Sequence, residues 1–97
     1  MGEIEFYENG LIAKCLQDIE DEHHNACQKH KHWPEDLIHS VSIMQEESGE
    51  AIRAALQCVY EGGAMAEVEK ELIQTAAMCV RALVNIRNGN TKEIKSV

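Results

Sequence analysis

A cluster of acidic residues in the middle of the chain has the residue types and spacing needed for metal chemistry. The run Gln45-Glu46-Glu47-Ser48-Gly49-Glu50 lies between two apolar stretches. In a helix, Glu47 and Glu50 share one face, and Glu46 lies on an overlapping one. Like charges at this spacing weaken an isolated helix by roughly 0.2–0.5 kcal/mol per pair. A divalent cation would offset that repulsion, whereas a solvated acidic helix face is the alternative interpretation.

A second acidic segment follows the Gly62-Gly63 break. It reads Glu67-Val68-Glu69-Lys70-Glu71-Leu72-Ile73-Gln74 and opens another stretch with apolar periodicity. Each residue advances a helix by about 1.5 Å along its axis. If the two stretches pair as antiparallel helices, Glu71 therefore lies closer along that axis to Glu50 than to Glu47. The spacing is therefore compatible with one carboxylate cluster that both helices share.

Apolar periodicity predicts the elements that position these residues. A first helix is expected over residues 1–24, where apolar side chains recur at intervals of three and four. A second is expected over 35–61, with Pro34 suited to its first turn, and a third over 65–88. Residues 89–97 form a C-terminal tail.

The second and third expected helices each have an apolar face that is broader than one partner helix can cover. On the second helix, Ile38, Ile52 and Val59 widen a stripe traced by Leu37, Val41, Met44, Ala51, Ala55 and Cys58. On the third, a 4-3-4-3 spacing predicts a close-packed heptad seam of Leu72, Ala76, Cys79, Leu83 and Ile86. A chain of 97 residues buries a limited core by itself. We therefore expect an all-α fold, a helical hairpin plus an N-terminal helix, that assembles into a four-helix-bundle-type homo-oligomer, either a dimer or a tetramer.

Composition and charge exclude several classes of partner. The net charge is −8, from 17 acidic and 9 basic residues, and the chain lacks the basic stripe of proteins that bind nucleic-acid polymers. No apolar run approaches the ~20 residues of a transmembrane helix. The N-terminus lacks the basic and apolar regions of a signal peptide. These features predict a cytoplasmic protein with no membrane partner.

A polar, His-rich loop is expected over residues 25–34, ahead of the second helix. Together with His23 it contains potential zinc ligands, namely Cys27, His30 and His32, but their spacing matches no recognised zinc finger and no second ligand pair follows. We expect a polar loop that is either mobile or faces a ligand.

The motifs resemble those of the MazG-like all-α nucleoside triphosphate pyrophosphohydrolases, whose signature is Glu-Glu-x-x-Glu, a gap, and then Glu-x-x-Asp. Glu46, Glu47 and Glu50 complete the first half, and Glu71 opens the second. Gln74 stands where the family has Asp. The resemblance covers roughly residues 20–87 and implies that the chain is a single MazG-like helical domain, residues 1–97.

The resemblance also implies a reaction and roles for individual residues. Such enzymes hydrolyse a nucleoside or deoxynucleoside triphosphate to the monophosphate and pyrophosphate by metal-activated water. Mg²⁺, or Mn²⁺ in its place, would be held by Glu47, Glu50, Glu71 and the uncharged oxygen of Gln74.

Further roles concern the attacking water and the substrate. Glu46 is the candidate catalytic residue that orients or deprotonates the water. Trp33 is a candidate for stacking on the base. Candidates for contact with the phosphates are His30, Lys31, Lys70 and Arg81.

Two other classes of protein are alternatives to this enzyme. A carboxylate-bridged di-iron bundle requires Glu-x-x-His in two helices, but Arg53 and Gln74 occupy the two His positions. A non-catalytic, degenerate helical oligomer that binds nucleotide or a protein partner without turnover is the stronger alternative, because the uncharged Gln74 weakens the expected metal site.

Overall fold

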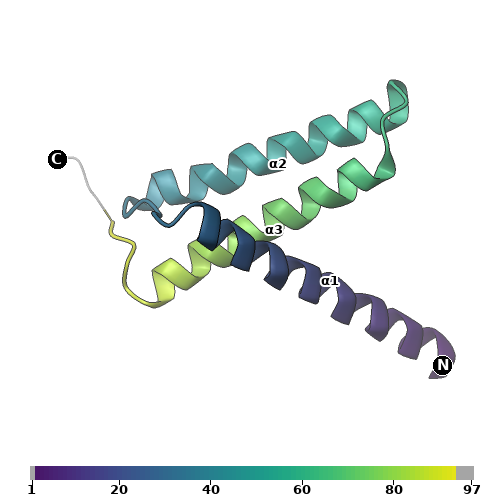
Figure 1. Cartoon of the computed structure of the whole chain (residues 1–97), viewed down its shortest axis with the longest axis horizontal. Coiled ribbons are helices and arrows are strands. Elements are labelled where there is room, and N and C mark those ends of the chain that lie inside the picture. The colour runs from purple at the N-terminus through teal and green to yellow at the C-terminus, as the bar shows by residue number, and fades with distance from the viewer. Residues whose placement is uncertain (1, 94–97) are drawn as a thin grey trace.

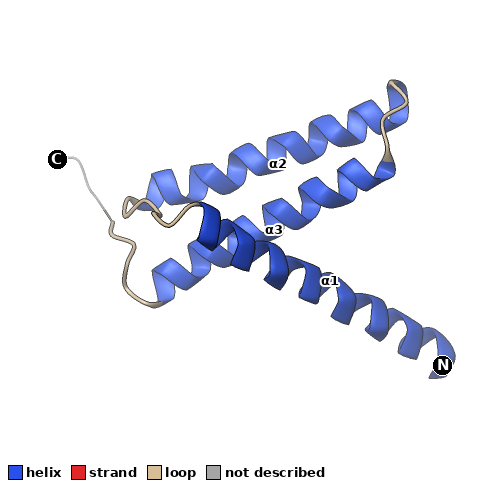
Figure 2. Ribbon diagram, viewed as in Figure 1, coloured by secondary structure: helices blue, strands red, loops and turns tan. Residues whose placement is uncertain are grey.

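A long helical hairpin with a third helix across it forms the fold. The computed structural model describes residues 2–93, with side chains from residue 7 onward. Within this range the elements are α1 (Gly2–Lys29), α2 (Leu37–Tyr60) and α3 (Met65–Arg87). Helices α2 and α3 run antiparallel, and α1 crosses α3 while its N-terminal half projects away from the hairpin (Figures 1 and 2). In the described part of the chain, α1 packs on α3 and not on α2. The expected all-α architecture of three packed helices is confirmed.

The glycine pair between α2 and α3 makes the hairpin turn. Gly62 adopts φ +72°, a conformation that side chains with a Cβ rarely take. At Gly63 a Cβ would lie 3.0 Å from the backbone carbon of Gln57. The N–H groups of Glu61 and Gly63 both donate to the Gln57 carbonyl at 2.9 Å. These contacts end α2 one residue before the predicted position, and α3 also ends one residue early.

Helix α1 is longer than the sequence predicted. The expected end was residue 24, but the helix continues to Lys29, so the first half of the predicted His-rich loop is helical. The guanidinium of Arg81 explains the extension, because it donates to the carbonyls of Ala26 (3.3 Å) and His30 at the C-terminal end of α1. The Ala26 carbonyl also accepts from the His30 N–H at 2.9 Å, and carbonyls at the C-terminal end of a helix favour a nearby positive charge. The first residue of the predicted helix lies outside the described residues.

The prediction that Pro34 lies in the first turn of the second helix is wrong. Helix α2 begins at Leu37, and Asp36 is its N-cap, with a carboxylate that accepts from the His39 N–H at 3.0 Å. Ahead of the cap the chain pairs with the C-terminal tail. The Lys92 carbonyl accepts from Leu37 N–H at 3.2 Å. The Lys92 N–H donates to the Glu35 carbonyl at 2.6 Å. Part of the predicted tail is therefore anchored, and residues 94–97 lie outside the described part.

The core of a single chain is small. The buried hydrophobic side chains in the described range are all alanines: Ala26, Ala51, Ala54, Ala77 and Ala82. The radius of gyration is 16.2 Å, compared with about 12–13 Å for a compact domain of this length. Many large apolar side chains are correspondingly exposed. No described helix has an apolar stretch of the length and hydropathy needed to cross a bilayer.

Candidate metal centre

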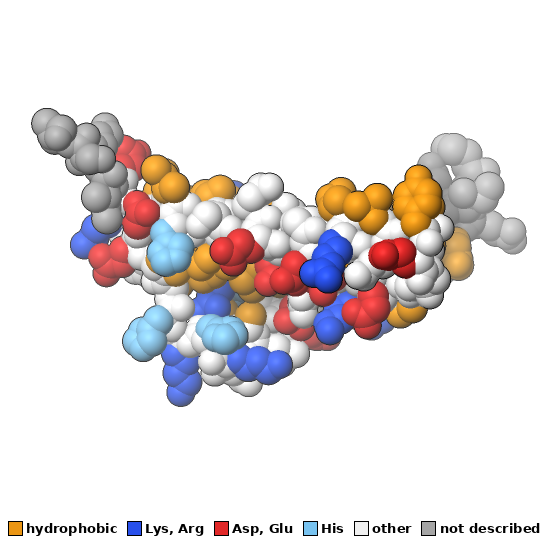
Figure 3. Space-filling model, turned by 90° about the horizontal axis from the view of Figure 1, so that it is seen from above, with side chains coloured by type: hydrophobic (Ala, Val, Ile, Leu, Met, Phe, Trp, Pro, Cys, Tyr) orange, Lys and Arg blue, Asp and Glu red, His pale blue; other side chains and the backbone are white. Residues whose placement is uncertain are grey.

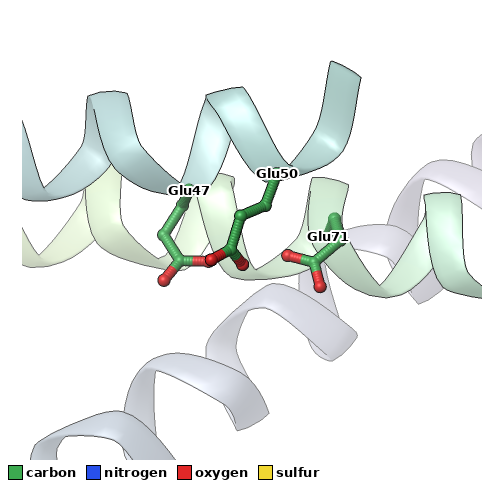
Figure 4. Close-up of side chains that lie close together, drawn as sticks. All are labelled: Glu47, Glu50 and Glu71. Atoms are coloured by element: carbon green, nitrogen blue, oxygen red, sulfur yellow. The ribbon is translucent and has the colours of Figure 1, made fainter. Parts of the chain in front are cut away.

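Three carboxylates from two helices converge beside the hairpin interface. Glu47 and Glu50 lie one turn apart on α2, and Glu71 approaches from α3 (Figure 4). One oxygen of each lies within 4.8 Å of the other two. Oxygens that share one cation at 2.0–2.6 Å are at most about 4–5 Å apart. The three side chains can therefore hold one divalent ion with little movement.

The electrostatics of this cluster favour an added positive charge. Burial raises the pKa of Glu47, and the charges of Glu50 and Glu71 raise it further. Burial also raises the pKa of Glu71, followed by the charge of Glu50. The Oε2 atoms of Glu47 and Glu71 are buried with no hydrogen-bond partner among the described residues. Buried acceptors without partners are costly, and either a proton or a cation would reduce that cost.

Glu46 and Gln74 lie next to the three carboxylates. Glu46 is exposed on α2, and its charge contributes to the raised pKa of Glu47. Gln74 is half-buried on α3 and lines a cavity together with Glu47. The roles predicted for both residues from the sequence stay predictions.

The cavity that Glu47 and Gln74 share has a volume of about 440 Å³. It lies between the C-terminal half of α1, the loop after it and the hairpin. Trp33, Ile43 and Met78 supply apolar walls. Pockets of ~300–1,000 Å³ with apolar walls and a few polar groups are the usual form of small-molecule sites. The carboxylate cluster therefore lies at the edge of a cavity of suitable size for a nucleoside.

Arg81 and Trp33 form the rigid end of this cavity. The Arg81 side chain is buried, and its guanidinium carbon lies 4.9 Å from the centre of the Trp33 ring. The Trp33 Nε1–H donates to Oγ of the fully buried Ser40 at 2.7 Å. Two of the Arg81 donors are already used by α1 carbonyls. Arg81 thus has a structural role, and any contact with phosphate would use its remaining N–H groups.

The other predicted substrate contacts divide between separate cavities. His30 lines the cavity beside Glu47. Lys31 lines a second cavity of about 560 Å³ that also includes Arg81 and Lys92. Lys70 lines a third, of about 420 Å³, together with Gln74. The described structure therefore does not bring Lys31 and Lys70 to the same cavity as His30.

The potential zinc ligands His23, Cys27, His30 and His32 do not form a metal-binding group in the described residues. Cys27 Sγ lies 3.6 Å from His23 Nε2. Among the described His, Cys, Asp and Glu side chains, the group able to hold a metal is Glu47, Glu50 and Glu71.

One acidic residue of this region was missed by sequence reasoning. Glu22 of α1 lines the cavity with Glu47 and adds to the rise of its pKa. Its place depends on how α1 crosses α3, and no local sequence pattern encodes that crossing. Besides Glu46, a further carboxylate, Glu22, therefore adds to the negative field beside the cluster.

These observations define the class of the protein as a small all-α protein of three packed helices. No family model, curated protein or solved structure matches the chain. What the site can do follows from its own residues, which are hard oxygen ligands at the edge of a partly apolar cavity. That combination suits a ligand with an anionic end and an apolar, planar end.

Proposed function

We propose that the protein is a Mg²⁺-dependent nucleoside triphosphate pyrophosphohydrolase of the MazG-like type. It would hydrolyse a nucleoside or deoxynucleoside triphosphate to the monophosphate and pyrophosphate. The observation that carries the proposal is the convergence of Glu47, Glu50 and Glu71 from two helices within 4.8 Å of one another. The buried, unpartnered oxygens of Glu47 and Glu71 suit a cation better than solvent. A cytoplasmic location and a homo-oligomeric assembly are part of this proposal.

The reaction requires positioning and charge neutralisation more than covalent assistance. When bound, Mg²⁺ supplies charge neutralisation for the phosphates and lowers the pKa of the attacking water. Glu47, Glu50 and Glu71 would hold it, while Gln74 offers a neutral carbonyl oxygen. Glu46, exposed beside Glu47, accepts the proton of the water.

The adjoining cavity accounts for the other end of the substrate. The Trp33 ring is held by Ser40 on one side and by Arg81 at 4.9 Å, so it is ordered before a ligand enters and loses little entropy on binding. Ile43 and Met78 complete an apolar wall for a base. His30, which lines the same cavity as Glu47, is the candidate for contact with the outer phosphates. Lys31 and Lys70 line separate cavities, so they would reach the same phosphates only by moving.

The test is product analysis with a panel of nucleoside and deoxynucleoside triphosphates in Mg²⁺ or Mn²⁺. We expect pyrophosphate and a monophosphate, and no release in chelator. Release of inorganic phosphate instead would indicate a different bond cleavage. An absence of products across the panel would contradict the proposed activity.

A degenerate, non-catalytic binder of nucleotide or of a protein partner is the second candidate. Gln74 favours it, because this residue lines the cavity next to Glu47 but adds no charge for a cation. Calorimetry separates the candidates. Nucleotide binding in the presence of Mg²⁺, without pyrophosphate release over many hours, would favour the binder.

A further inference from the structure

The second cavity, of about 560 Å³, lies beside the one that adjoins the carboxylate cluster. His32, Trp33 and Arg81 line both cavities, whereas the three clustered carboxylates do not line the second one. Its walls come from the C-terminal end of α1 and the loop after it, from the C-terminal end of α3, and from the tail. Apart from Cys27, Trp33 and Gly89, its lining residues carry charged, amide or imidazole side chains. This cavity therefore suits a polar ligand.

The charge of this cavity is opposite to that of the whole protein. The chain has 17 acidic and 9 basic residues and a net charge of −8. Lys31, Arg81 and Lys92 nevertheless line this cavity. The acidic residue among its lining is Glu35, and three cations with one carboxylate leave a local charge of about +2 at neutral pH. Figure 3 shows His side chains gathered with Lys and Arg side chains towards one end of the molecule. A positively charged cavity concentrates anions.

Arg81 offers the cavity N–H donors that are already held in place. Its guanidinium is fixed by the carbonyls of Ala26 and His30 and by the Trp33 ring, whose centre lies 4.9 Å away. A guanidinium has several N–H donors, so these two carbonyls leave others for a ligand. The Arg81 side chain is buried, and a charge-assisted hydrogen bond is stronger there than in water.

The groups that would repel an anion here already have partners. The carbonyls at the end of α1 accept from the Arg81 guanidinium. At the end of α3, the Asn85 carbonyl accepts from the N–H groups of Asn90 (2.9 Å) and Thr91 (3.2 Å). The Glu35 carboxylate lies 3.6 Å from the amine of Lys92, and both side chains are 68% exposed. Exposed pairs of this kind contribute little, so the Lys92 amine can turn to an incoming anion.

We propose that the second cavity binds the dianionic phosphate group of a small polar ligand, either free phosphate or a phosphomonoester. A phosphate with two charges, its usual state at pH 7, matches the local charge. Two lysines and an arginine from separate segments can surround a tetrahedral group, whereas a planar carboxylate needs only one guanidinium. The amides of Asn85 and Asn90 line the space beside them and suit the hydroxyl groups of an ester. The proposal depends neither on the metal centre nor on hydrolysis.

Titration of the wild type in chelator, followed by NMR, locates the site. The probes are inorganic phosphate and glucose 6-phosphate, with glucose and sodium chloride as controls at matched ionic strength. The side-chain amide signals of Asn85 and Asn90 should shift with a dissociation constant of about 1 mM or below. Gln74, which lines the first and third cavities, should not respond.

The two probes also distinguish the two sources of phosphate. Tighter binding of glucose 6-phosphate would identify a phosphomonoester as the ligand, and equal or weaker binding would identify free phosphate. An absence of saturable shifts at Asn85 and Asn90, or shifts that require Mg²⁺, would overturn the proposal.

Substitutions in the lining should change phosphate affinity in opposite directions. Lys92→Gln should weaken it by about fivefold, and Glu35→Gln should strengthen it by a similar factor, because one removes an attracting and the other a repelling charge. Both residues pair with the neighbouring segment through their backbones, which the substitutions leave intact. Lys70→Gln is the matched control, since Lys70 lines the third cavity. Equal affinities of Lys92→Gln and the wild type would contradict the proposal.

Two cysteines allow a test of the wild type without any substitution. Cys27 lines the second cavity, whereas Cys15 lines a cavity with Asp18 and Glu69. Iodoacetate is an anion and iodoacetamide is neutral, so the ratio of their rates at one thiol reports the local charge. Peptide mass spectrometry should show a ratio at least about threefold higher at Cys27 than at Cys15, and phosphate should slow iodoacetate at Cys27 alone. Equal ratios at the two thiols, or no protection by phosphate, would overturn the proposal.

Discussion

Glu50→Gln should raise the thermal stability of the protein when metal is removed by chelator. Glu50 is exposed, so the isosteric change costs little packing. Its charge is the largest charge contribution to the raised pKa values of both Glu47 and Glu71. The substitution therefore removes two like-charge pairs and leaves the other two carboxylates in place.

The magnitude follows from the geometry. Two unit charges at the 4.8 Å limit of the cluster repel by about 0.9 kcal/mol in bulk water. Two such pairs, reduced by partial salt screening, amount to about 1 kcal/mol. For a domain of this size, 1 kcal/mol corresponds to ~4–8 °C in Tm. We expect an increase of about that size.

The assay is thermal unfolding followed by circular dichroism at fixed protein concentration, with chelator and with Mg²⁺. Glu20→Gln is the matched control, because Glu20 is an exposed α1 residue and its change of net charge is the same. The gain from Glu50→Gln should disappear in saturating Mg²⁺, where the wild type gains stability by binding. A Tm in chelator no higher than that of the wild type would refute the reasoning that these carboxylates repel one another in the fold.

Three further predictions concern neighbouring groups. Gln74→Asp should tighten Mg²⁺ binding without nucleotide, measured by calorimetry, because Asp adds charge; an unchanged affinity would mean that residue 74 does not face the metal. Arg81→Met should lower the free energy of unfolding in urea by about 2–3 kcal/mol, since the His30 carbonyl loses its Arg81 donor and the Ala26 carbonyl keeps only the His30 N–H; an unchanged midpoint would contradict this structural role. In chelator, stability should increase as pH falls from neutral towards 4.5, the ordinary carboxyl value. The raised pKa makes the folded state bind protons more tightly, and this contribution is lost as pH rises through the raised pKa. Thermal melts of Glu47→Gln should show a weaker dependence on pH than those of the wild type.

The hairpin and the convergence of acidic residues on it could be inferred from the sequence, because both follow from local rules. The period of the apolar residues predicts α2 and α3, and the Gly62-Gly63 pair predicts the turn between them. Because the helices are antiparallel, the number of residues from the turn determines where Glu50 and Glu71 lie along the helix axis. The metal role of the cluster stays a prediction.

The features that sequence reasoning missed depend on contacts between distant segments. The extension of α1 to Lys29 requires Arg81 from α3, more than fifty positions away. The backbone ahead of α2 pairs with Lys92 of the tail, a contact that no local pattern predicts. The heptad seam predicted through Leu72 and Leu83 is not close-packed within the chain, since the two side chains are 56% and 47% exposed; periodicity alone does not say what covers an apolar face.

Pyrophosphate release by the wild type, Glu47→Gln and Glu20→Gln, each with a nucleoside triphosphate and Mg²⁺, tests the central claim most directly. The claim is that Glu47, Glu50 and Glu71 are a metal centre for hydrolysis. It predicts release by the wild type and Glu20→Gln, and a loss of at least about 100-fold in Glu47→Gln, since one charged ligand is removed. Equal release by all three proteins, or release that persists in chelator, would contradict the claim.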